Sequence, residues 1–175
     1  MAITTQRSQV KLAKDVKAKA TPYFVFGKTS KWDDDKNPPA PKREVNALSE
    51  IIGYKKVSTV SMCRPKKPNE TSNYQTVYYN NQEWLLVPDA NAETENATYI
   101  YYEVDVLPSD FPLGTYRQVG LQFDVRPKTG VTKSNLLPTE LSSAGYLYAY
   151  ENSKPVNRIE NVTINNRFIL SVTGK

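Results

Sequence analysis

Residues 99–106 read Tyr99-Ile100-Tyr101-Tyr102-Glu103-Val104-Asp105-Val106, and this stretch is the clearest strand signal in the chain. Aromatic and β-branched residues fit a pleated, partly buried surface. Glu103 and Asp105 alternate with apolar residues, so the pattern predicts a strand with one face in water. Because residues two apart in a strand share a face, the two carboxylates indicate the solvent side rather than an acid and base pair.

The same signal recurs on both sides of this stretch. Residues 23–26 form a compact apolar run that stops at Gly27, which is typical of a buried strand. The sequence predicts further strands at residues 56–64, 75–79, 83–87, 116–125, 146–150 and 163–172. Asn80-Asn81, between two of these segments, predicts a tight hairpin.

Two segments near the N-terminus have helical spacing instead. In residues 9–20 the apolar positions are Val10, Ala13, Val16 and Ala20, with lysines between them. In residues 44–52 the apolar positions are Val45, Leu48, Ile51 and Ile52, with an acidic residue near the start and a glycine after the end. The sequence therefore predicts a mainly β fold, β-sandwich-like with α+β character, and one or two short helices near the N-terminus.

The length of 175 residues suits one domain. We predict a single domain over residues 1–175. Residues 1–21 are expected to form a basic N-terminal arm or short helix, and residues 22–175 a β-rich body.

The composition argues against catalysis. The chain has no histidine, the side chain most used for proton transfer near neutral pH. Its single cysteine, Cys63, lies in a strand-like run and is expected to fill the core, because no histidine is present to activate it. Asp33, Asp35, Asn37 and Glu44 match part of a calcium-loop spacing, but proline stands where that loop needs glycine. We expect no enzyme activity, no cofactor and no metal.

The formal charge of +5 raises the alternative of a basic nucleic-acid-binding module. Much of the charge lies before the first predicted strand, at Arg7, Lys11, Lys14, Lys17 and Lys19. The tyrosine-rich strands leave a carbohydrate-binding β-domain as a second alternative, since exposed rings stack on sugars or bases. No stretch approaches the roughly 20 apolar residues that a membrane span needs, so no membrane partner is expected.

Two stretches resemble a known family. The first is Tyr23-Phe24-Val25-Phe26-Gly27-Lys28-Thr29-Ser30-Lys31-Trp32, followed by aspartates and Asn37-Pro38-Pro39-Ala40-Pro41. The second is Gly145-Tyr146-Leu147-Tyr148-Ala149-Tyr150-Glu151-Asn152-Ser153-Lys154-Pro155-Val156, with Asn165-Asn166-Arg167-Phe168-Ile169-Leu170 beyond it. Together they resemble a baseplate wedge subunit of contractile-tailed phages, the family of the dimeric wedge component of T-even-type phages, in a shortened version.

The resemblance implies a structural virion protein without enzyme activity. Such a protein dimerises, docks to other baseplate wedge and tail proteins, and is found in the tail baseplate, after assembly in the host cytoplasm. We expect its protein contacts at aromatic and proline residues of the two stretches, namely Trp32, Pro38, Pro39, Pro41, Tyr148 and Tyr150. The alternative for Trp32 is that it caps the protein's own core.

Overall fold

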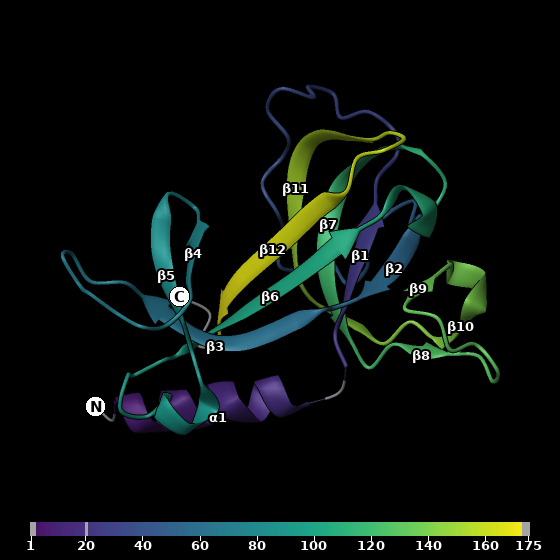
Figure 1. The fold of residues 1–175 in the computed structure, drawn as a ribbon. Helices are drawn as coiled ribbons and strands as arrows, with labels where there is room; N and C mark the ends of the chain where they lie inside the picture. Colours follow the sequence, from purple (N-terminus) through teal and green to yellow (C-terminus); the bar gives the residue numbers. More distant parts are fainter. Residues whose placement is uncertain (1–2, 20, 173–175) are drawn as a thin grey trace. The chain divides into compact units, whose positions relative to one another are not determined.

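The structure, a computed structural model, describes residues 3–19 and 21–172. In this part of the chain one α-helix is followed by strands and three short 3-10 turns (Figure 1). The chain packs into two compact units. The first unit holds residues 3–19, 58–103 and 166–172, and the second holds residues 21–57 and 104–165.

The first unit is built on a five-stranded sheet in the order β12-β6-β3-β5-β4. Its strands are β3 (Thr59–Pro65), β4 (Thr76–Tyr79), β5 (Gln82–Val87), β6 (Tyr99–Val106) and β12 (Ile164–Ser171), of which β6 and β12 continue into the second unit. Its core contains Cys63, Val77, Trp84, Leu86, Tyr101 and Ile169. β3 pairs antiparallel with β5 and with β6, and β4 pairs antiparallel with β5, as the alternating sequence patterns favour.

The predicted hairpin at Asn80-Asn81 is confirmed. Tyr79 pairs with Gln82, and the two asparagines between them have φ of 47° and 60°. Positive φ at both central positions is the type I′ geometry, which asparagine tolerates better than most residues. The turn therefore fixes the register in which β4 and β5 pair.

The predicted N-terminal helix is also confirmed, as α1 (Gln6–Ala18) in the first unit. It begins three residues earlier than expected because the side chain of Thr5 accepts a hydrogen bond from Ser8 N and caps it. Val10 and Ala13 are fully buried on its inner face. Ala20, the last residue of the predicted helix, lies outside the described residues.

The second unit is built on a sheet in the order β11-β7-β1-β2-β9. Its strands are β1 (Tyr23–Gly27), β2 (Gly53–Lys56), β7 (Gly114–Phe123), β9 (Asn135–Leu136) and β11 (Tyr146–Arg158), and a two-stranded sheet pairs β8 (Arg126–Pro127) with β10 (Leu141–Ser143). Every residue of β1 is buried, as predicted for residues 23–26. A Cβ on Gly53 would overlap the ring of Phe111, so this glycine allows β2 to lie close to that side chain.

The predicted helix at residues 44–52 is wrong. This segment is irregular, and Glu50 has a φ of 47°. Its backbone bonds to the end of β1 and to the residue after it: Ile52 N donates to Phe26 O at 2.8 Å, and Lys28 N donates to Ser49 O at 2.7 Å. These long-range bonds override the local helical spacing, although Leu48 is buried and Ile51 packs against the same core cluster.

The predicted fold class, mainly β and sandwich-like with a short N-terminal helix, is confirmed. The predicted strand at residues 56–64 begins later, at Thr59, and the strand predicted at residues 146–150 continues to Arg158. The single domain over residues 1–175 stays a prediction. Among the described residues, none of the helices has the length and apolar character needed to cross a bilayer.

Candidate docking surface

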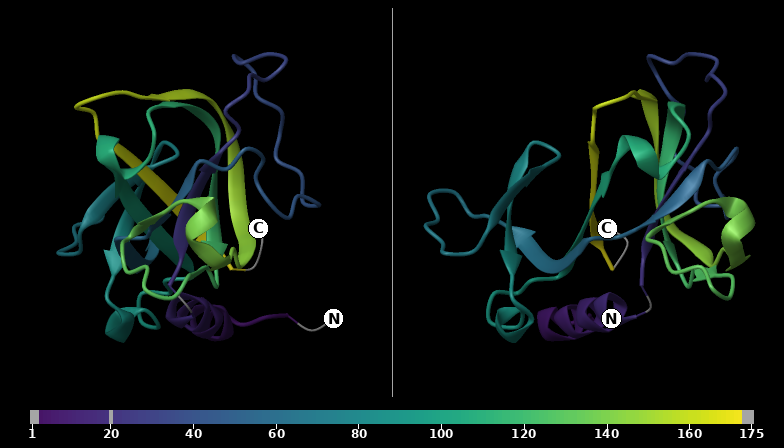
Figure 2. Two further views of the ribbon diagram at one scale, coloured as in Figure 1. Left: turned by 90° about the vertical axis from the view of Figure 1, so that its right-hand side faces the viewer. Right: turned by 45° about the vertical axis from the view of Figure 1, so that its right-hand side comes forward.

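A long irregular segment, residues 28–52, arches beside β11 in the second unit (Figures 1 and 2). We call it the Trp32 loop. Its two ends are joined by Glu50, whose carboxylate accepts hydrogen bonds from Thr29 Oγ1, Ser30 N and Ser30 Oγ, each at 2.6 Å. Bonds from Ser30, then Thr29, lower the pKa of Glu50 to about 2, so the carboxylate stays charged near neutral pH. The loop is thus closed at its base by a carboxylate that is ionised near neutral pH.

Arg117 of β7 binds the Trp32 loop through its guanidinium group. Its side chain is buried, with Nε 2.7 Å from Asp35 Oδ1 and Nη2 2.9 Å from Asp35 Oδ2, which makes a bidentate ion pair. Nη1 donates to Thr29 O at 2.7 Å. The hydrogen bond from Arg117 lowers the pKa of Asp35. One buried cation therefore fixes two separate points of the Trp32 loop.

Strand β11 anchors the loop from the side. Trp32 Nε1 donates to Ser153 O at 3.0 Å, and Asn152 Nδ2 donates to Pro39 O at 2.8 Å. The hydroxyl oxygen of Tyr150 accepts from Lys42 N at 2.6 Å and donates to Lys42 O at 3.1 Å. With these anchors an otherwise irregular segment has a defined path.

A groove of about 350 Å³ opens between the loop and β11. The wall on the loop side consists of Pro41, Lys42, Arg43, Val45 and Asn46, and the floor on the β11 side consists of Leu147, Tyr148, Ala149 and Tyr150. The ring of Tyr148 packs edge-on against Phe123 with centroids 4.6 Å apart, which fixes its position. The groove has an aromatic floor beside two exposed cations, a combination suited to binding another protein.

Comparison with known proteins identifies the family of this chain. Residues 1–172 match the family described as "Baseplate wedge 3 tail fiber network component". The chain belongs to this family. It is also 38% identical over 176 residues to "Virion protein 3" of Enterococcus phage phiEF24C, an alignment that covers 100% of this chain and 97% of that protein. The protein is therefore a baseplate wedge component located in the tail of a phage virion, and the resemblance seen in the sequence is confirmed.

The structure gathers the predicted contact residues of this wedge component in one region. Pro41, Tyr148 and Tyr150 line the groove, while Trp32 and Pro39 line the adjacent hollow of the same loop. Pro38, which directly precedes Pro39, is half-buried. The indole N–H of Trp32 is bonded within the chain, and Lys28 Nζ lies 5.3 Å from the ring centroid, so this residue anchors its own loop.

Sequence reasoning missed the residues that hold the surface together. Arg117, Asn152 and the Lys42-Arg43 pair were not singled out, although each contributes to the loop or the groove. Arg117 carried one usable signal, because it is the one charged residue of a long strand-like run, and a charged residue that is buried needs a partner. The Lys42-Arg43 pair was visible as a basic step directly after the prolines.

The side chains that could have served as catalytic or metal-binding groups have structural roles in the wedge component. Cys63 is fully buried, and burial raises the pKa of its thiol. The carboxylate of Asp35 pairs with Arg117, and that of Asp34 accepts from Lys36 N and Asn37 Nδ2, both at 2.8 Å. Within residues 3–19 and 21–172 no group of three or more His, Cys, Asp or Glu side chains is placed to hold a metal ion.

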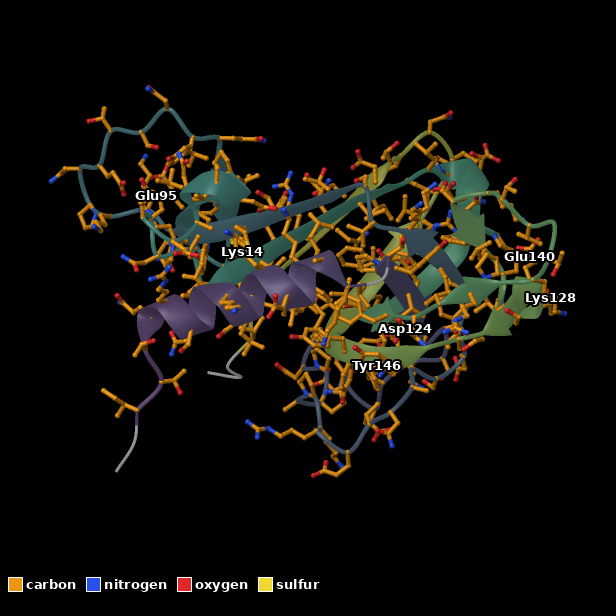
Figure 3. The ribbon with its side chains drawn as sticks, turned by 90° about the horizontal axis from the view of Figure 1, so that it is seen from below. Lys14, Glu95, Asp124, Lys128, Glu140 and Tyr146 are labelled. Carbon is orange, nitrogen blue, oxygen red and sulfur yellow. The ribbon has the colours of Figure 1, made fainter. Side chains whose placement is uncertain are left out.

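Two cations of the basic N-terminal segment form ion pairs within the first unit. Lys17 Nζ lies 2.6 Å from both carboxylate oxygens of Asp89, and Arg7 Nε lies 3.2 Å from Glu93 Oε2. In the first unit, Figure 3 shows Lys14 on α1 and Glu95 on the neighbouring segment. The figure also labels Tyr146, which lies at the start of β11 in the second unit. These ion pairs leave a smaller basic surface than the sequence suggests.

Proposed function

We propose that this wedge component acts as a docking subunit and that the groove beside the Trp32 loop is the surface that binds a neighbouring wedge or tail protein. The proposal includes self-association as a homodimer and the absence of catalysis. The observation that carries it is the anchored loop, which presents exposed prolines and cations next to an aromatic floor.

Preorganisation supports the proposal. Arg117, Asn152 and Tyr150 hold the loop in one path before any partner arrives. A surface that is already ordered loses less conformational entropy on binding than a mobile one. Prolines at positions 39 and 41 restrict the backbone further, while their rings stay exposed.

The charges of the groove indicate the partner's chemistry. Lys42 and Arg43 are exposed on the loop wall, beside the rings of Tyr148 and Tyr150. Arginine and tyrosine are the residue types that most often dominate binding energy at protein interfaces. The partner is therefore a protein surface with carboxylates at its rim and an apolar group for the groove.

A charge-reversal experiment tests this function. The double variant Lys42→Glu and Arg43→Glu is mixed with each of the other baseplate wedge proteins of the same phage, and affinity is measured by interferometry. The matched control is Arg126→Glu with Lys128→Glu, two exposed cations of the same unit that lie outside the groove. We expect at least about a tenfold loss of affinity for the groove variant and less than about a twofold change for the control. Equal affinity of both variants for every wedge protein would refute the proposal.

A further inference from the structure

The β4 edge of the first unit differs from the other long edges of the two sheets. β4 pairs with β5 on one side and has no strand on the other among the described residues. Residues 71–82, which contain this strand, include neither a charged residue nor a proline. By contrast, β12 at the other edge of the same sheet carries Arg167, and β11 carries Lys154 and Pro155. Charges and prolines are the usual protection of an edge against pairing, so β4 is the unprotected edge.

The register of the hairpin shows which backbone groups of β4 are free. Leu86 N donates to Gln75 O at 2.9 Å, and Tyr79 pairs with Gln82 across the turn. In an antiparallel ladder alternate residues point toward the same neighbour, so residues 75, 77 and 79 bond to β5. The N–H and C=O groups of Thr76 and Tyr78 therefore point away from β5, toward the open edge.

The side chains at these two positions are also available. Thr76 is exposed, and Tyr78 is 62% exposed, the most exposed ring in the described part of the chain. Val77, between them, faces the core and is 8% exposed. Figure 1 shows the β4–β5 hairpin at the end of the sheet.

We propose that β4 is an edge for strand addition at which a second copy of this chain pairs through its own β4, antiparallel about a two-fold axis at Val77. Val77 then lies opposite Val77 of the second copy, and Thr76 lies opposite Tyr78 in both directions. Each Thr76–Tyr78 pair exchanges two backbone hydrogen bonds, which makes four in all. The same register places a β-branched side chain beside an aromatic one, a favourable cross-strand combination.

Because the β4 edge is complementary to itself, it favours a second copy of this chain as its partner. An uncharged edge presents no electrostatic preference for a different chain, and a two-fold axis satisfies all four outward groups of both strands. The inference deepens the homodimer part of the proposed function and is independent of the groove beside the Trp32 loop. Because the strand is short, the association is expected to depend on protein concentration.

The first test removes the backbone N–H of residue 76, which points toward the open edge. Thr76→Pro removes that donor but leaves the bonds between β4 and β5, because proline is tolerated on an edge strand when its nitrogen faces outward. Thr76→Val keeps the N–H and the β-branched shape and is the matched control. Solution mass is measured by light scattering over a wide concentration range. We expect Thr76→Pro to weaken the dimer by about tenfold or more, and Thr76→Val by less than about twofold.

The second test is cross-linking, which does not depend on the folding of the proline variant. Opposed residues of a non-hydrogen-bonded pair have Cα atoms about 4.5 Å apart, within disulfide range. Val77→Cys is expected to form a disulfide-linked dimer under mild oxidation. In Gln75→Cys the two thiols are offset by four residues, roughly 13 Å along the strands, and no link is expected. The natural Cys63 lies on β3, which β5 separates from the open edge, so it is not positioned to link two copies there.

The outcomes separate the two proposals. A dimer that Thr76→Pro leaves unchanged, or a wild-type chain that stays monomeric at every concentration, overturns pairing at β4. Neither result alters the expected loss of wedge-protein binding in the Lys42→Glu and Arg43→Glu variant, which tests the groove alone.

Discussion

The hydroxyl oxygen of Tyr150 contacts both backbone polar groups of Lys42, which lies 108 positions earlier in the chain. One side chain of β11 thus substitutes for the neighbouring strand that the Trp32 loop lacks at this point. This contact joins the loop side of the groove to its β11 side.

Tyr150→Phe is expected to loosen the loop with little effect on the fold. The variant loses two hydrogen bonds and is expected to lower the free energy of unfolding by about 1 kcal/mol. Amide hydrogen exchange at Lys42 is expected to accelerate more than exchange in β7. Tyr146→Phe is the control, since Tyr146 is 47% exposed and makes no hydrogen bond through its hydroxyl in the described structure. Equal exchange at Lys42 in both variants would count against the anchor.

Acid is expected to destabilise the loop. The pKa of Glu50 falls from 4.5 in the unfolded chain to about 2 in the fold. A depressed carboxyl pKa stabilises the fold fully above the unfolded value, and the stabilisation disappears as pH falls toward the folded value. Urea midpoints measured between pH 6 and about pH 2 are therefore expected to fall less steeply for Glu50→Gln than for the wild type. Glu44→Gln, an exposed change in the same loop, is expected to follow the wild-type curve.

Two substitutions of Asn81, in the turn between β4 and β5, are expected to change the free energy of unfolding in opposite directions. Asn81 has a φ of 60°, which glycine adopts without strain and valine resists. Asn81→Gly is expected to raise the free energy of unfolding by about 0.5 kcal/mol, and Asn81→Val to lower it by about 1–2 kcal/mol. Thermal melts followed by circular dichroism measure both. A valine variant as stable as the wild type would argue against the type I′ turn.

The two tryptophans report on the two units separately and test the predicted single domain. Trp84 belongs to the first unit and Trp32 to the second. If residues 1–175 unfold as one domain, Trp32→Phe and Trp84→Phe each show one fluorescence transition, and each coincides with the circular dichroism transition of the same variant. A fluorescence midpoint that departs from the circular dichroism midpoint in either variant would divide the chain into two domains.

Strands were predictable because their signal is local. Alternation in residues 99–106, the apolar run of residues 23–26 and the asparagine pair at the turn each depend on neighbouring positions only. The helix expected at residues 44–52 failed because its backbone bonds to residues 26 and 28, and local spacing contains no information about such partners. The strand from Tyr146 was predicted too short because its apolar pattern ends at the polar run from Glu151 to Lys154, whereas the structure continues the pairing beyond a shift in register.

The candidate surface was only partly predictable. Aromatic and proline residues from two distant stretches were expected to make contacts, and the structure places Trp32, Pro41 and Tyr150 in one region. Arg117 could not be assigned its role, because its partner Asp35 lies 82 positions away. Nor did the sequence indicate that Trp32 is bonded within the chain.

Three anchors of the Trp32 loop have main-chain atoms as their hydrogen-bond partners. Trp32, Asn152 and Tyr150 all bind main-chain atoms, at Ser153, Pro39 and Lys42 respectively. Every amino acid supplies a carbonyl oxygen and all but proline supply an N–H, so the side chains at these three positions can change while the hydrogen bonds persist. Among related phages the recognition chemistry of this surface can therefore diverge without rebuilding the scaffold beneath it.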